Sequence, residues 1–224
     1  MGRKGRLDRQ KFKNRSTGNR KSNSRAKRQY FLIVCEGEET EPNYFKALAR
    51  ELPRGLVQVD IEGTGYNTRS LVKRAETIKS EKEKFSTRKI DEVWVVFDRD
   101  SFPRDDFNAA VSKCEKKPRF FAGYSIEAFE LWYLLHFAYH NTGMSRDQYR
   151  SKLEKHVQNC APNTKWKYLK NDPEIYSLLK TYGDEAQAIK YAENLFLSYT
   201  DQRYAGHDPC TTVHQLVQKL NVYK

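Results

Sequence analysis

The sequence predicts an α/β protein with a mainly parallel four-stranded sheet flanked by helices and a helical C-terminal extension. Short runs of β-branched, aromatic and apolar residues alternate with amphipathic stretches at the spacing typical of β-α-β units. The two strongest apolar runs, residues 31–35 and 93–97, lack polar alternation. That pattern indicates strands covered by helices on both faces.

The first half of the chain is predicted to supply all four strands. We expect them at residues 31–35, 57–61, 92–97 and 119–124, with helices at 39–52, 70–85 and 102–117 between them. In the first helix Thr40 can cap the amino end, and Phe45, Leu48 and Leu52 form an apolar stripe. The charged run in 70–85 is interpreted as a solvated helix face.

The second half is predicted to be helical. Residues 127–137 carry enough aromatic and aliphatic side chains for a largely buried helix, and further helices are expected at 146–157, 173–182, 184–199 and 211–220. Residues 159–173 are expected to be a loop. We therefore divide the chain into an amino-terminal arm (1–28), an α/β core (29–140) and a helical extension packed on that core (141–224).

The basic charge of the chain is concentrated in the arm. Residues 1–28 contain twelve Lys or Arg and a single acidic residue, Asp8, whereas the rest of the chain has 29 basic and 28 acidic residues. Such a segment has too little apolar surface to offset the entropy of ordering, so we expect it to be disordered in isolation. It can attract nucleic-acid phosphates, although a merely solubilising tail would look the same.

Composition excludes several protein classes. Among the 224 residues, 38% are hydrophobic, which is enough for a packed core. No apolar run approaches the roughly 20 residues that span a bilayer, and no hydrophobic signal core is visible, so a cytoplasmic protein without membrane contact is expected. The four cysteines show no zinc-ligand spacing and are expected to be free thiols.

Carboxylates follow the two strongest predicted strands. Glu36 ends the first, and Asp98 and Asp100 end the third, with alternation that points both aspartates the same way on an extended backbone. In a parallel sheet these strand ends meet at one edge, where ligands bind. Clustered carboxylates call for a cation, and hard oxygen ligands favour Mg²⁺ or Mn²⁺. Two simpler interpretations need no metal. Glu36 could form an ion pair with a basic side chain, and Asp98-Arg99-Asp100 could be a turn with no functional role.

Four ordered motifs resemble the RloB family, which has a Toprim-like domain related to OLD-type and abortive-infection nucleases. They are VCEGEETEPNYF at 34–45, VVFDRD at 95–100, FELWYLLHF at 129–137 and PCTTVHQLV at 209–217. The resemblance runs from about Gln29 to the end of the chain. It departs where family members often have Asn-Pro-x-Phe-Glu, because Glu127 and its neighbours differ and only Phe129-Glu130 matches.

The resemblance implies roles for individual residues. Glu36 corresponds to a metal ligand or general base, Asp98 and Asp100 complete the metal site, and Glu130 and His214 are further catalytic candidates. Of the acids after Glu36, we take Glu39 as an additional metal ligand, with Glu38 as the alternative. Glu38, Glu39 and Glu41 could instead stabilise the helix dipole with no catalytic role. His136 is as easily a core histidine.

The expected function is therefore a Mg²⁺-dependent endonuclease that hydrolyses phosphodiester bonds. The RloB resemblance implies a role in anti-phage defence, beside an ABC- or AAA-type ATPase, with RNA, of which tRNA is one candidate, favoured over DNA as substrate. The rival is a non-catalytic module that binds nucleic acid or the ATPase. Phosphoryl or nucleotidyl transfer at the same edge is a third reading, and the absence of a Walker loop argues against autonomous ATP hydrolysis.

Overall fold

The predicted four-stranded parallel sheet is confirmed in the computed structural model, which describes residues 28–65, 68–100, 103–162 and 165–224. Its strands are β1 (Gln29–Cys35), β2 (Val57–Gly63), β3 (Glu92–Arg99) and β4 (Phe120–Ile126), in the order β2-β1-β3-β4. All three pairings are parallel, and β1 lies beside β3 as the clustering of their terminal acids requires. The expectation of a disordered arm falls outside the described residues, apart from Arg28.

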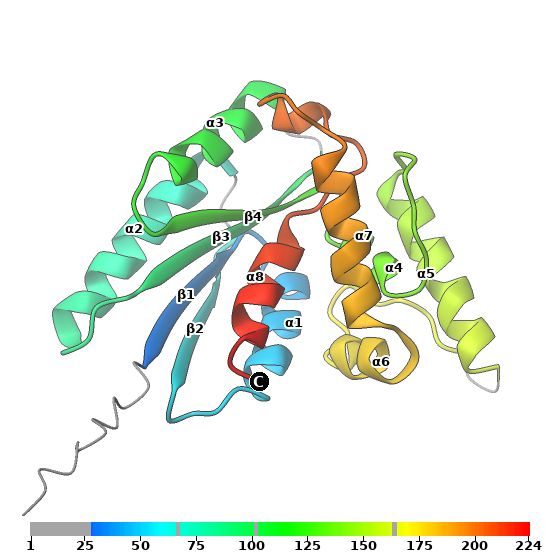
Figure 1. The fold of residues 1–224 in the computed structure, drawn as a ribbon, viewed down its shortest axis with the longest axis horizontal. Helices are drawn as coiled ribbons and strands as arrows, with labels where there is room; N and C mark the ends of the chain where they lie inside the picture. The colour runs from blue at the N-terminus through cyan, green and yellow to red at the C-terminus, as the bar shows by residue number, and fades with distance from the viewer. Residues whose placement is uncertain (1–27, 66–67, 101–102, 163–164) are drawn as a thin grey trace, which may run out of the picture.

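Helices cover both faces of the sheet (Figure 1). One face is covered by α2 (Thr68–Phe85) and α3 (Arg104–Glu115), and the other by α1 (Thr40–Ala49) and α8 (Val213–Asn221). The central strands face both layers: Phe31 and Ile33 of β1 point into one core and Leu32 and Val34 into the other. This explains why their sequences lack polar alternation.

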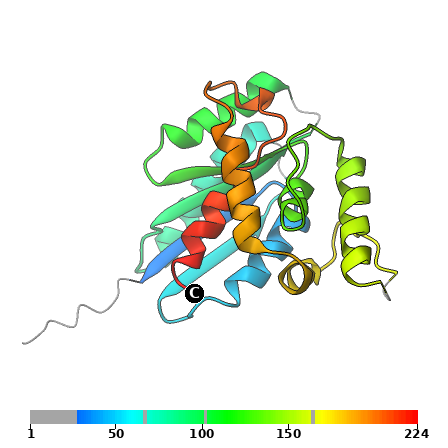
Figure 2. The same cartoon turned by 45° about the vertical axis from the view of Figure 1, so that its right-hand side comes forward.

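The remaining helices extend the layer that contains α1 and α8. They are α4 (Glu130–Leu135), α5 (Arg146–Cys160), α6 (Ile175–Tyr182) and α7 (Glu185–Leu197). The short 3₁₀ helix η2 (Tyr204–Gly206) instead packs on the other face, against α3. In both views α4 lies between the sheet and α5, which stands at the outer side (Figures 1 and 2). The chain then returns to the sheet, where Thr211 forms an isolated antiparallel β-bridge with Ser125 of β4.

Several element boundaries differ from the sequence predictions. The helix predicted at 127–137 is shorter, because β4 extends to Ile126 and Glu127 adopts a positive φ of 69° before the helical turn begins. Thr40 does not cap α1: it is the first helical residue, and its hydroxyl donates to the Lys170 carbonyl at 2.8 Å. That bond ties α1 to the C-terminal extension.

The cysteines are all free, as expected, with Cys35, Cys114 and Cys210 buried and Cys160 exposed. No helix within the described ranges has the length and apolar character needed to cross a membrane.

Candidate metal and phosphate site

The loop after β1 and the end of β3 meet at the carboxyl edge of the sheet. The Glu36 N–H donates to the Val96 carbonyl at 2.8 Å, and the Asp98 N–H donates to Glu36 Oε2 at 3.3 Å. The register that pairs Cys35 with Val96 sets this position. The predicted juxtaposition of Glu36 with Asp98 is therefore present.

Two glycines permit close packing of the loops at this edge. A Cβ atom on Gly37 would lie 2.5 Å from Glu41 Oε2, and one on Gly63 would lie 2.8 Å from the Glu38 Cα atom. Any larger residue at either position would force the β1–α1 loop or the Glu41 carboxylate to move. Gly37 thus makes room for an acidic side chain.

These elements enclose a cavity of about 270 Å³ at the carboxyl ends of β1 and β3. Its lining is strongly charged, with five carboxylates and two basic side chains among the described residues. The lining residues are Glu36, Gly37, Thr40, Glu41, Gly65, Asp98, Asp100, Glu130, Arg146 and Lys170. Four of the predicted site residues, Glu36, Asp98, Asp100 and Glu130, therefore share one cavity.

Asp98 is the most perturbed acid of the cavity. Its Oδ2 atom accepts from the Phe129 N–H at 3.0 Å, whereas its Oδ1 atom is buried with no hydrogen-bond partner among the described residues. Burial raises the pKa of the Asp98 carboxyl well above its ordinary value, and the charges of Glu41 and Glu130 add to that rise. A buried acceptor without a donor is the atom that a cation would satisfy.

Arg146, the first residue of α5, is the cation that faces these acids in the structure. Its Nη2 atom lies 3.6 Å from Asp98 Oδ2 and 3.8 Å from Asp100 Oδ2, and it donates to the Glu127 carbonyl at 3.5 Å. Sequence reasoning could not select Arg146, because only tertiary packing of the extension brings it to the sheet edge.

Glu41 is the acid that sequence reasoning undervalued. It is only 5% exposed, and burial together with the charge of Glu130 raises the pKa of its carboxyl. By contrast Glu39, the predicted ligand, is exposed and does not line the cavity. The spacing could have revealed this, since Glu41 lies four positions before Phe45 and seven before Leu48, on the buried face of α1.

Glu130 begins α4 and is 3% exposed. The Nε atom of Arg150 donates to its Oε1 atom at 3.2 Å, and the Arg150 guanidinium lies over the Tyr168 ring at 5.6 Å. The extension thus contributes a second arginine that fixes an acid of the cavity.

The structure does not bring His214 to this site. It lies in α8 and is 2% exposed; its Nδ1 atom is 3.0 Å from the Thr211 carbonyl, and its ring contacts Phe196. His136 is also buried, with Nδ1 2.9 Å from the Trp132 carbonyl. Neither histidine lines the acidic cavity.

The donor set suits a hard divalent cation, because carboxylate oxygens are the ligands that Mg²⁺ and Mn²⁺ prefer. Glu36, Asp98 and Asp100 are the residues that would hold it. As the side chains stand, however, no group of three or more His, Cys, Asp or Glu residues in the described part of the chain is arranged to hold a metal ion. Arg146 lies against Asp98 and Asp100 instead.

A family model described as RloB-like protein matches residues 31–220, most of the chain. No curated protein and no solved structure matches.

Proposed function

The chain belongs to the RloB-like protein family, and from that premise we propose that it is a metal-dependent nuclease that hydrolyses phosphodiester bonds. The observation that carries the proposal is the buried Asp98 carboxyl, with an unpartnered oxygen and a raised pKa, among four further carboxylates. Buried like charges cost folding free energy, and their accumulation in a cavity is typical of a functional site.

The basic side chains of the cavity supply what a phosphate needs. Arg146 can donate two parallel hydrogen bonds to phosphate oxygens, and Lys170 adds a second positive charge. A bound divalent cation would polarise the phosphate and lower the pKa of a water molecule. Asp98 and Asp100 would hold such a cation, and Arg146, which now faces both acids, would then be available to the phosphate of the substrate.

Glu41 is suited to proton transfer. Burial and the neighbouring Glu130 raise the pKa of its carboxyl above the ordinary value, and a carboxylate with a raised pKa is a stronger base. We assign Glu41 the role of general base, with Glu36 held by the Asp98 N–H as a metal ligand. Glu130, which Arg150 holds in place, supports Glu41 and Glu36 electrostatically.

Purified protein would be tested on labelled tRNA, single-stranded RNA and plasmid DNA, with Mg²⁺, Mn²⁺ or EDTA, beside Asp98→Asn. We expect cutting of RNA that needs the cation and is absent in the variant. Asparagine keeps the Oδ2-type acceptor for the Phe129 N–H, so the variant should fold. Cutting that persists in Asp98→Asn would refute the assignment, and a preference for plasmid would change the substrate to DNA.

The rival function is a binding module without catalysis, and the Arg146 ion pairs favour it, because they neutralise two acids of the cavity. The family resemblance implies an anti-phage system with an ATPase partner, which we include in the proposal. Phage plating on cells that carry the complete system would separate the readings. Protection that survives loss of both Asp98 and Asp100 would favour the binding module.

A further inference from the structure

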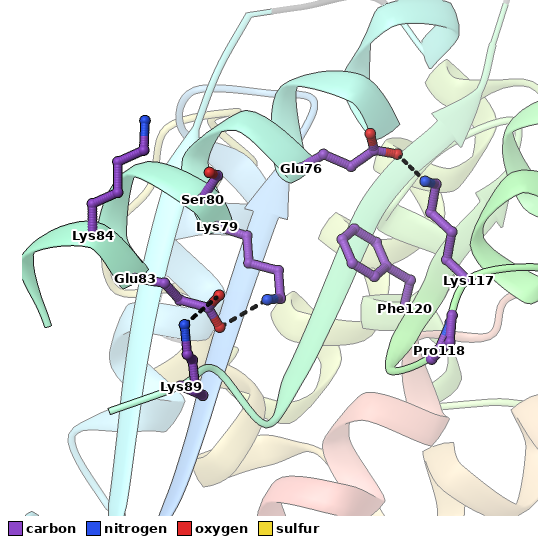
Figure 3. Close-up of a pocket in the computed structure, with 9 residues that line it drawn as sticks. All are labelled: Glu76, Lys79, Ser80, Glu83, Lys84, Lys89, Lys117, Pro118 and Phe120. Atoms are coloured by element: carbon purple, nitrogen blue, oxygen red, sulfur yellow. Dashed lines mark ion pairs between the residues drawn. The ribbon is translucent and has the colours of Figure 1, made fainter. Parts of the chain in front are cut away.

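A groove of about 550 Å³ lies at the amino edge of the sheet, opposite the acidic cavity. One wall is the last half of α2, with Lys79, Lys84 and Glu83. The rest of the lining is Lys89, before β3, and Lys117, Pro118 and Phe120, before and at the start of β4 (Figure 3). Four lysines and two glutamates line it within the described chain.

The acids of this groove serve the fold. Glu83 Oε1 lies 2.7 Å from Lys79 Nζ and accepts from the Ile90 N–H at 2.9 Å, and Glu76 lies 2.6 Å from Lys117 (Figure 3). These contacts fasten α2 to the loops before β3 and β4. Lys84 makes no ion pair within the described residues, and Lys89, with its side chain 76% exposed, is 3.9 Å from Glu83. The groove therefore keeps an excess of positive charge.

A second groove, of about 390 Å³, lies at the amino ends of β1 and β2. Its charged lining residues, among those described, are Arg28, Arg54 and Arg88, and no acid lines it. The consecutive residues Arg88 and Lys89 line one groove each, so the loop between α2 and β3 joins the two. The described chain also begins here, at Arg28, immediately after the segment that carries eleven further Lys or Arg residues.

The two grooves lie at the amino edge of the sheet, far enough from the acidic cavity for the two sets of charges to interact only weakly. Strands of seven residues, such as β1, span about 23 Å at roughly 3.3 Å per residue. This exceeds twice the Debye length of about 8 Å at physiological ionic strength. The carboxylates of the cavity therefore lower the positive electrostatic potential at the two grooves only weakly. A polyanion is attracted to the amino edge while the carboxyl edge, without a cation, repels it.

We propose that the two grooves form a polyphosphate-binding surface for a single strand of nucleic acid, separate from the acidic cavity. The basic grooves track the backbone, and the side chain of Phe85, which follows the groove residue Lys84 and is 93% exposed, offers a face on which a base stacks. The surface holds part of a long strand about one sheet length from the cavity. The inference shares the nucleic-acid partner with the proposed function but needs no cation and no cleavage.

Binding of full-length protein to a labelled single-stranded RNA of about 20 nucleotides, longer than the roughly 4–16 nucleotides of a compact site, would be measured in EDTA across salt concentrations. The test variant carries Arg54→Gln, Lys84→Gln, Arg88→Gln and Lys89→Gln. Each lost phosphate contact lowers the slope of log K against log salt by about 0.7 for a single strand, so we expect a decrease of about 3. Because Arg88 also lies over the Tyr30 ring at 5.8 Å, a triple variant that retains it guards against misfolding and should lower the slope by about 2.

The matched control removes the same net charge from exposed lysines of the extension, at Lys152, Lys155, Lys167 and Lys190. The proposal requires its slope to stay within about 1 of the wild-type value. Equal weakening by both sets would mean attraction by net charge alone and would overturn the proposal, as would an unchanged slope in the groove variant. A groove variant that keeps RNA binding but loses binding to vesicles of anionic phospholipid would assign the surface to a membrane instead. The test measures RNA binding and not cleavage. Its result can therefore be interpreted even if the protein proves not to be a nuclease.

Discussion

Arg146 Nη2 lies 3.6 Å from Asp98 Oδ2, and this contact joins the C-terminal helical extension to the end of a central strand. Arg146 also faces Asp100 at 3.8 Å. The arginine therefore stands against the two acids that would bind a divalent cation. In the proposed mechanism, this one side chain affects both the binding of a divalent cation and the binding of phosphate.

Arg146→Met should separate these two roles. Removing the guanidinium takes the positive charge of Arg146 away from Asp98 and Asp100, so Mg²⁺ should raise the melting temperature of the variant more than that of the wild type. Cleavage should fall by about 100-fold, because a donor to the developing phosphate charge is lost. Calorimetry with and without Mg²⁺ and a cleavage assay measure both effects.

The control for Arg146 is Lys219→Met, which removes an ion pair of 3.2 Å with Glu92 away from the cavity. It should respond to Mg²⁺ as the wild type does. If Arg146→Met gained no Mg²⁺ stabilisation over this control, Arg146 would not compete with a cation.

Glu41→Gln and Glu39→Gln form a matched pair on the same turn of chain. Glu41 is buried in the cavity with a raised pKa, and Glu39 is exposed outside it. Loss of a general base typically costs about 100-fold or more in rate, so we expect that loss for Glu41→Gln and less than about twofold for Glu39→Gln. Single-turnover cleavage rates at saturating Mg²⁺ test this difference. A larger loss of rate in Glu39→Gln than in Glu41→Gln would restore Glu39 as the predicted metal ligand.

The position of Glu41 shows what sequence reasoning could reach and where it stopped. Hydrophobic runs without alternation correctly predicted β1 and β3 as buried neighbours, and with them the meeting of Glu36 and Asp98. The burial of Glu41 follows from helical spacing, because Glu41 shares a face of α1 with Phe45 and Leu48. Glu39 lies just before the first helical residue, Thr40, and local propensity does not fix that boundary.

The basic half of the cavity was out of reach for a different reason. Arg146 and Lys170 lie on the extension, and long-range contacts such as the Thr40 hydroxyl to the Lys170 carbonyl bring that segment to the site. No periodicity encodes which of the many basic residues will arrive there. His214 misled for the converse reason: its motif is polar, yet its side chain is in the core.

Asp98→Asn should stabilise the fold at neutral pH in the absence of divalent cations. Burial and the charges of Glu41 and Glu130 raise the pKa of Asp98, so its ionised form is costly in the folded state. We expect a gain of about 1 kcal/mol in the free energy of unfolding, measured with urea at pH 8 in EDTA. A destabilised variant would mean that the Arg146 pair outweighs the cost of burial.

The stability that Asp98→Asn gains over the wild type should decrease as pH falls. Because the folded pKa of Asp98 is raised, the folded state binds its proton more tightly, and the wild type recovers stability as pH falls through that folded pKa. The recovery is complete below the unfolded value of about 3.9. The difference between wild type and Asp98→Asn should therefore narrow on acidification, and a constant difference would contradict the raised pKa.

His214→Gln should affect stability and spare the chemistry. The ring is buried in α8, its Nδ1 atom lies at hydrogen-bond distance from the Thr211 carbonyl, and burial lowers its pKa. Replacing it should cost about 1–3 kcal/mol, the usual penalty for disturbing a buried hydrogen bond, and leave kcat within about twofold at a temperature where the variant is folded. A large drop in kcat without destabilisation would return His214 to the catalytic residues.

The same histidine gives a pH test of the fold. A folded pKa below the unfolded value of about 6.5 means that the neutral ring contributes stability fully above that pH and loses it as pH falls toward the folded pKa. His136, whose pKa burial lowers to about 4, acts in the same direction. Urea unfolding between pH 8 and pH 5 should show a decline in stability that is smaller in His214→Gln than in the wild type. A decline of equal size in both proteins would show that the titration of His214 is not linked to folding.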